Sequence, residues 1–198
     1  MGDVAITNGP YNEPGGAYMF YGTDSSYIEF PNKGGPNTQF SFTLMCWVQP
    51  RGQDGPLFSY GVIDYGVVAI ANSTLFNQIV QRGHPYHLTG MTTPEVLPAR
   101  KWVHVAASYD HNTRNNSLYI NGHLSVSQII DKRYLIATIK TNVRMGTRSV
   151  NNKNFKGKIA EMKVYDVALN EAQIQTSIRQ GNCTSPEIFV SLPCPMIP

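Results

Sequence analysis

Short runs of alternating apolar and polar residues recur through most of the chain and predict β-strands. In the run FSFTLMCWV, every second residue from Phe40 to Val48 falls on one face of a strand, while Met45 and Trp47 fall on the other. Both faces of this strand are therefore expected to be covered, and Pro50 is expected to end it. Similar runs predict strands at residues 17–22, 27–30, 57–60, 66–71, 77–81 and 86–90.

Residues 101–124 predict the middle of an antiparallel meander. The dipeptide Asn121-Gly122 favours positive φ at both positions, which is typical of a tight type I′ hairpin. A longer polar loop is expected over residues 110–117, and its part Asp110–Asn116 is the section of this stretch expected to face a partner. The three strands of the meander are expected at residues 102–109, 117–120 and 123–127.

The run LNEAQIQTSIRQG predicts one helix near the end of the chain. Asn170 is expected to cap its start, with Gln173 completing a capping box. Leu169 is placed to pack on Ile174, and Gly181 marks the C-terminal stop. Many short strands followed by a single helix predict an all-β, two-sheet antiparallel sandwich with a short C-terminal helix lying against it.

Composition fits one globular domain with a substantial core. The chain has 198 residues, of which 41% are hydrophobic and 15% charged. The formal net charge of +3 is too small to indicate a nucleic-acid partner. No apolar run reaches the roughly 20 residues that cross a bilayer, so no membrane insertion is expected.

Cysteines and glycosylation sequons favour an extracellular or cell-surface location. Cys46 lies in an apolar strand and is expected to be a buried free thiol, whereas a disulfide between Cys183 and Cys194 would close a loop in the tail. The start, Met1-Gly2-Asp3, does not resemble a signal peptide, so the chain is either cytosolic or follows a removed signal. Three sequons lie in predicted loops or tails, so N-glycosylation is expected at their asparagines, Asn72, Asn115 and Asn182.

Four spaced segments carry a family resemblance: FSFTLMCWVQP, KWVHVAASYD, SLYINGHL and FKGKIAEMKVYDVALNEAQI. Together they resemble laminin G-like domains of the concanavalin A-like lectin/glucanase superfamily, in the branch related to pentraxins. The resemblance implies a two-sheet antiparallel jelly roll over residues 17–181. Residues 1–16 are then an N-terminal extension, and residues 182–198 are a Pro-rich tail. The family resemblance does not identify a ligand, because members of the family bind glycans, proteins or only neighbouring domains.

The resemblance also implies a structural calcium ion between an early turn and the late Gly-x-Ile strand. Asp24 occupies the turn where relatives place an acidic ligand, and Glu161 lies near the late motif. Ser25 and Ser26 stand where relatives often have more acid, and Ala160 where they often have Asp. With so few carboxylates the site would be weak or structural, and Asp24 as an ordinary Asx-turn residue is the alternative.

Catalytic and zinc sites are not predicted. His104, His111 and His123 lack the compact spacing of zinc sites, and two of them fall at opposite ends of one strand. Glycoside hydrolysis needs two facing carboxylates, whereas Glu161 has Lys163 two residues on and no acidic neighbour on its face.

A basic segment indicates an acidic ligand. Half of the chain's Lys and Arg residues fall within residues 131–158. They could bind a sulfated or acidic polysaccharide, or they could be scattered over different surfaces. The basic residues are Lys132, Arg133, Lys140, Arg144, Arg148, Lys153, Lys156 and Lys158.

The leading functional prediction is a non-catalytic extracellular recognition module that binds a glycan or a matrix or cell-surface protein. A purely structural domain of a larger protein and a divergent glycoside hydrolase are the alternatives.

Overall fold

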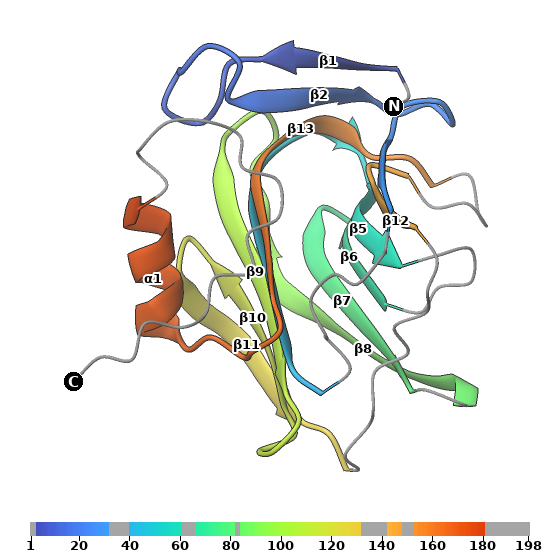
Figure 1. The fold of residues 1–198 in the computed structure, drawn as a ribbon, viewed down its shortest axis with the longest axis vertical. Coiled ribbons are helices and arrows are strands. Elements are labelled where there is room, and N and C mark those ends of the chain that lie inside the picture. The colour runs from blue at the N-terminus through green and yellow to red at the C-terminus, as the bar shows by residue number, and fades with distance from the viewer. Residues whose placement is uncertain are drawn as a thin grey trace.

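Two antiparallel sheets packed face to face, with one short helix outside them, make up the described part of the chain (Figure 1). The computed structural model describes residues 3–31, 40–60, 66–81, 84–131, 142–147 and 153–180. The predicted fold class, an all-β two-sheet jelly-roll sandwich with a C-terminal helix, is confirmed.

The larger sheet has seven strands in the order β1-β2-β13-β4-β9-β10-β11. Every pairing in it is antiparallel. Its strands are β1 (Val4–Thr7), β2 (Ala17–Tyr21), β13 (Lys156–Tyr165), β4 (Phe42–Gln53), β9 (Val103–Asp110), β10 (Asn115–Ile120) and β11 (His123–Ile129).

The smaller sheet has six strands in the order β3-β12-β5-β6-β7-β8. Consecutive strands from β5 to β8 are neighbours, so this half is a simple meander, while β12 returns from late in the chain to pair with β3 and β5. Its strands are β3 (Ile28–Phe30), β12 (Val143–Met145), β5 (Gly55–Tyr60), β6 (Gly66–Ala71), β7 (Thr74–Gln81) and β8 (His84–Val96).

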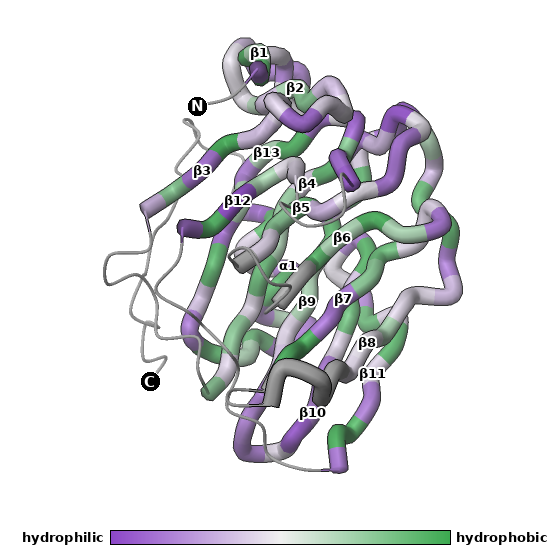
Figure 2. Tube along the Cα trace, turned by 90° about the vertical axis from the view of Figure 1, so that its right-hand side faces the viewer, coloured by the Kyte–Doolittle hydropathy of each residue, from purple (hydrophilic) through white to green (hydrophobic). Residues whose placement is uncertain are grey.

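The main core fills the space between the sheets. Figure 2 shows the alternation of hydrophobic and hydrophilic residues along several strands that this burial requires. In β4, Leu44, Cys46 and Val48 belong to this core, as the period of two predicts. Cys46 is a free thiol with no exposed surface, so that prediction is confirmed, and burial raises its pKa.

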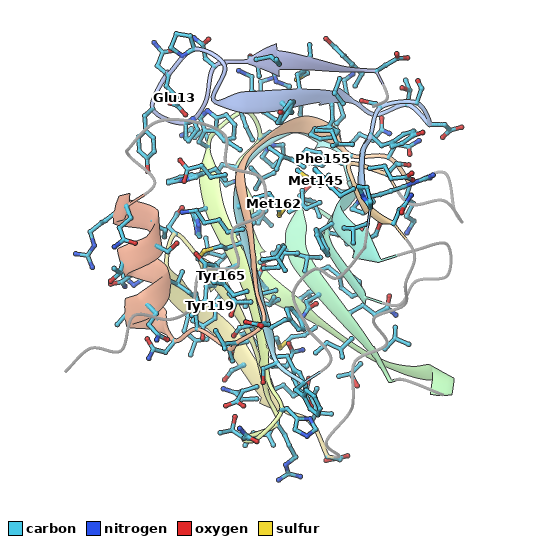
Figure 3. All side chains as sticks on the ribbon, in the orientation of Figure 1. Glu13, Tyr119, Met145, Phe155, Met162 and Tyr165 are labelled. Carbon is cyan, nitrogen blue, oxygen red and sulfur yellow. The ribbon has the colours of Figure 1, made fainter. Side chains whose placement is uncertain are left out.

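A second apolar layer lies on the outer face of the seven-stranded sheet, under α1 (Glu171–Gln180). Met45 of β4 packs there with Tyr119 and Ile174, and Figure 3 shows Tyr119 and Tyr165 near the helix. The predicted capping box is confirmed: Asn170 Oδ1 accepts from Gln173 N at 3.0 Å, and Asn170 N donates to Gln173 Oε1 at 2.9 Å.

The hairpin at Asn121-Gly122 is confirmed by φ values of 51° and 80°, and β9, β10 and β11 form the predicted meander. The long loop predicted over residues 110–117 is wrong, because β10 already starts at Asn115. The turn is shorter since the Asp110 carboxylate accepts hydrogen bonds from Asn112 N and Thr113 Oγ1, both at 2.9 Å.

Two other boundaries differ from the expectation. Pro50 does not end β4, which continues to Gln53; Pro50 pairs with Gly157 beside a register shift, where a missing N–H does not break a regular ladder. Within the N-terminal extension expected over residues 1–16, Val4–Thr7 adds the edge strand β1 to the larger sheet.

A buried hydrogen bond joins the two sheets. Asn77 of β7 donates through Nδ2 to Oδ1 of Asn116 in β10 at 2.9 Å. Asn77 is 1% exposed and Asn116 is fully buried. The expectation that Asn116 belongs to a partner-facing loop is therefore wrong. No described residue accepts a hydrogen bond from Asn116 Nδ2. The pair is therefore a polar contact between the sheets that carries one unsatisfied donor.

This inter-sheet pair should show strong coupling in a double-mutant cycle. Asn77→Ala or Asn116→Ala should each lower the free energy of unfolding by about 1–3 kcal/mol, because each leaves the other buried amide without its partner. The double variant should cost less than the sum of the two, as measured by urea unfolding. Asn8→Ala is the control, since the Asn8–Asn12 bond is exposed; additive losses in the buried pair would contradict this prediction.

Candidate functional site

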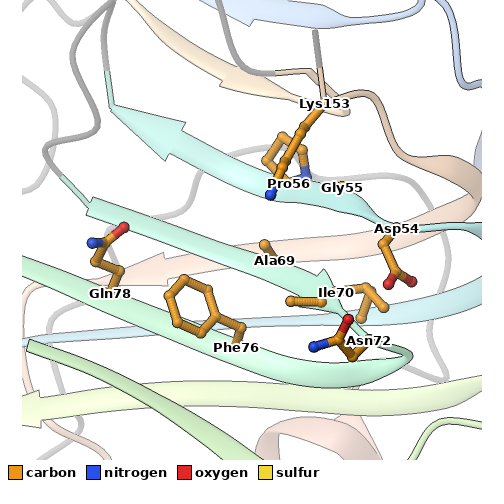
Figure 4. Close-up of a pocket in the computed structure, with 10 residues that line it drawn as sticks. Asp54, Gly55, Pro56, Ala69, Ile70, Asn72, Phe76, Gln78 and Lys153 are labelled. Atoms are coloured by element: carbon orange, nitrogen blue, oxygen red, sulfur yellow. The ribbon is translucent and has the colours of Figure 1, made fainter. Parts of the chain in front are cut away.

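A pocket of about 370 Å³ opens on the outer face of the six-stranded sheet (Figure 4). Val68 and Ile70 of β6 belong to the core, so Ala69 between them points to the opposite face. Phe76 of β7 pairs directly with Ala69 and presents its ring on this side. The pocket is lined by Asp54, Gly55, Pro56, Ala69, Ile70, Ala71, Asn72, Phe76, Gln78 and Lys153.

The hairpin turn between β6 and β7 forms one end of this pocket. Asn72 and Ser73 have φ values of 50° and 60°, which makes a two-residue turn with both positions left-handed. Asp54 Oδ2 accepts from Ser73 N at 3.1 Å, and Thr74 Oγ1 donates to Ala71 O at 2.7 Å. These bonds hold the turn without a glycine and fix Asn72 at the rim.

Polar side chains of the pocket are available to a ligand. Three polar side chains of the pocket make no hydrogen bond to any residue of the described ranges, namely those of Asn72, Gln78 and Lys153. Phe76 and Gln78 are half-buried on neighbouring outward positions of β7. An aromatic ring beside amide, carboxylate and ammonium groups can stack on an apolar ring face while bonding to hydroxyl or acidic groups.

The described residues of the predicted basic segment lie in several environments. Lys153 lines the pocket, whereas Arg144 Nε donates to Glu29 Oε2 at 2.6 Å and the guanidinium lies 4.7 Å from the centre of the Tyr27 ring. The Arg144 bond holds the pKa of Glu29 below its ordinary value, with help from Asn142.

Lys156 and Lys158 lie on β13 in the other sheet, and Lys158 Nζ is 6.0 Å from the centre of the Trp102 ring. These described basic residues are therefore not gathered in one patch. The remaining four, Lys132, Arg133, Lys140 and Arg148, lie outside the described residues.

The two expected calcium ligands have separate surroundings. Asp24 Oδ1 accepts from Asn154 Nδ2 at 2.6 Å and so ties the early turn to the segment before β13. Glu161 lies in the middle of β13, where burial raises its pKa and Lys163, 3.9 Å away, opposes the rise. Among the described residues no three His, Cys, Asp or Glu side chains are grouped as metal ligands, so the calcium site stays a prediction.

Each histidine of the central meander has different neighbours. His104 is 4% exposed and its ring lies edge-on to Trp47 at 5.4 Å. His111 contacts Phe40, and His123 Nδ1 is 3.3 Å from Glu171 Oε1. The three side chains therefore do not converge on one centre.

Two of the expected glycosylation sites are described. Asn72 is exposed in its turn, whereas Asn115 is half-buried and paired in β10 with Asp110 on one side and Ile129 on the other. Asn182 and both cysteines of the expected disulfide, Cys183 and Cys194, lie outside the described residues, so these stay predictions.

Comparison with known families matches residues 22–175 to the family described as "Concanavalin A-like lectin/glucanases superfamily". The chain belongs to this family, as the spaced motifs indicated. No curated protein sequence matches the chain.

Solved structures share the fold at low sequence identity. The binding domain of Paraclostridial Mosquitocidal Protein 1 has a TM-score of 0.70 and 16% identity over 89% of this chain and 45% of its own. The heptameric SAP-like pentraxin of Limulus polyphemus has a TM-score of 0.61 and 16% identity, covering 81% of this chain and 80% of its own.

The botulinum neurotoxin serotype D ligand binding domain, solved in complex with N-acetylneuraminic acid, has a TM-score of 0.69 and 13% identity. The match covers 90% of this chain and 46% of that one, so this chain spans less than half of either toxin domain. These neighbours are binding domains and a pentraxin, although the superfamily also contains glucanases.

In the part of the chain that the structure describes, no helix is long and apolar enough to cross a bilayer.

The burial of His104 predicts an acid-sensitive fold. Burial, and secondarily Lys163, lowers the pKa of His104 to about 3 from 6.5, and no described residue bonds its Nδ1. Between these values the unfolded chain binds a proton that the folded chain does not, so stability falls as pH drops below about 6.5. The loss should be on the order of 2 kcal/mol at pH 5, measured by urea unfolding across pH.

His104→Gln should remove this part of the pH dependence between pH 7 and pH 5, even though the substitution also lowers overall stability. His123→Gln is the control, because the His123 side chain is 73% exposed. Equal slopes in both variants would show that His104 does not carry the effect.

Proposed function

We propose that this domain is a non-catalytic recognition module that binds a glycan in the pocket above β5, β6 and β7. The observation that carries the proposal is the pairing of the Phe76 ring with unengaged amide and ammonium groups in one concave site. Sugars present apolar ring faces and many hydroxyl groups, and a site of this composition bonds to both. Its volume of about 370 Å³ is that of a small-ligand pocket and suits a short saccharide.

The pocket also favours a sugar with an acidic group. Lys153 brings a positive charge to the rim, and the one carboxylate among the described lining residues, that of Asp54, already accepts a bond from the backbone of Ser73. A carboxylate or sulfate on the ligand would make a charge-assisted bond to Lys153. Arg144, by contrast, is engaged with Glu29 and contributes nothing to this site.

The similarity to other binding domains supports this proposal without fixing the ligand. One structural neighbour was solved with N-acetylneuraminic acid, which is an acidic sugar. An extracellular or cell-surface location, expected from the sequons and the tail cysteines, belongs to the same proposal. So does binding to a matrix or cell-surface protein through the sugars that such a partner carries.

Substitutions in the pocket should weaken glycan binding without unfolding the domain. In a glycan array and in titrations with sialyllactose, Phe76→Ala should weaken binding about tenfold or more, because it removes the stacking surface. Lys153→Gln should reduce binding of sialyllactose towards the level of lactose, its neutral counterpart, and high salt should have the same effect.

Lys156→Gln is the matched control, because Lys156 is equally basic but lies in the other sheet. Equal binding by the Phe76, Lys153 and Lys156 variants would contradict the proposed site. Binding of a partner protein with no response to any glycan would favour a purely structural domain.

Calcium binding at Asp24 stays part of the proposal and is tested separately. If Asp24 holds calcium, added Ca²⁺ should raise the melting temperature, EDTA should reverse the rise, and Asp24→Asn should remove it. Glu161→Gln should act in the same way only if both residues hold the ion. A melting temperature that responds to neither Ca²⁺ nor EDTA would contradict a calcium site.

A further inference from the structure

Asn72 belongs both to the pocket and to a glycosylation sequon. It is one of the residues that line the pocket, and it is the acceptor of the sequon Asn72-Ser73-Thr74. A glycan on this sequon is linked through the Asn72 side-chain amide, which is exposed in the hairpin turn. The first sugar would therefore stand at the rim of the pocket.

We propose that N-glycosylation of Asn72 closes the pocket, so that the chain exists in a binding form without this glycan and a self-occupied form with it. This inference rests on the proposed glycan-binding function and adds its regulation. The occupant is the core of the chain's own N-glycan, and the external ligand competes with it.

The geometry of β7 places the stacking surface within reach of that glycan. Thr74, Phe76 and Gln78 follow one another on the outward face of β7, directly after the turn. Two residues along a strand span roughly 7 Å, which is the step from Thr74, next to the turn, to Phe76; Figure 4 shows Phe76 and Asn72 lining the same pocket. Since Asn72, Gln78 and Lys153 make no side-chain bonds to the described residues, the occupant displaces no contact of the fold.

Tethering makes even weak occupancy effective. A group held on a short link has an effective concentration on the order of 1 mM at its site. Suppose that the glycan core binds the pocket with a dissociation constant ten times lower than this concentration. The apparent affinity of an external ligand then falls about tenfold. Steric blocking of the rim adds to this effect.

The sequon at Asn115 provides an internal comparison. Asn115 belongs to β10 in the seven-stranded sheet, and the sequon residues that follow it, Asn116 and Ser117, are 0% and 2% exposed. A glycan there would be attached to the sheet that does not carry the pocket. Removing this sequon should therefore leave ligand binding unchanged.

The test compares the chain secreted from glycosylating cells with the chain made in bacteria. Mass spectrometry should find a glycan on Asn72, and sialyllactose should bind the secreted form at least tenfold more weakly than the bacterial form. Thr74→Val removes the sequon and should restore binding to the secreted form, whereas Thr74→Ser keeps the sequon and should not. Ser117→Ala, which removes the sequon at Asn115, should change nothing.

Two results would overturn the inference: an unmodified Asn72 in the secreted chain, or a glycan on Asn72 with unchanged sialyllactose affinity. A second measurement keeps it separate from the proposed function. Amide NMR shifts of Phe76 and Gln78 should differ between the secreted form and the bacterial form, which have the same sequence. If sialyllactose binds neither form, equal shifts overturn the inference as well, while different shifts support occupancy of the pocket and contradict only the proposed external ligand.

Discussion

The fold depends on β4, which is apolar on both faces and therefore must be covered on both sides. Leu44, Cys46 and Val48 enter the core between the sheets, while Met45 lies under α1 and Trp47 meets the ring of Tyr11 from the β1–β2 connection at 5.7 Å. Covering this second face occupies the outside of the seven-stranded sheet. The pocket opens on the outer face of the six-stranded sheet.

Periodicity and capping could be predicted from the sequence because they depend on neighbours along the chain. The alternation in β4, the Asn121-Gly122 hairpin and the Asn170 cap all follow local rules, and the structure has all three. Asn116 was misplaced because nothing local distinguishes a polar loop residue from an amide that reaches across the core to Asn77. Such a partner is 39 residues away in the chain and is visible only after the sheets have packed.

The pocket was missed for a related reason. The outward positions of β7 follow from its alternation, but the hollow beside Phe76 depends on Pro56 in β5, on the small Ala69 in β6 and on Lys153 from a distant segment. The basic segment left two arrangements open, one surface or several, and of its described residues Arg144 and Lys158 belong to different sheets. Charge clustering along a chain of alternating sheets therefore says little about clustering in space.

Among the described residues, α1 covers the outer face of the seven-stranded sheet, and this gives the domain an orientation. Helix α1 lies on the outer face of the seven-stranded sheet (Figure 1), whereas the pocket opens on the outer face of the other sheet. A neighbouring domain or a solid support that contacted α1 would approach from the side of the seven-stranded sheet. The pocket would then face away from the attachment, and copies arrayed on a surface would present their sites outward, which is the geometry that multivalent binding requires.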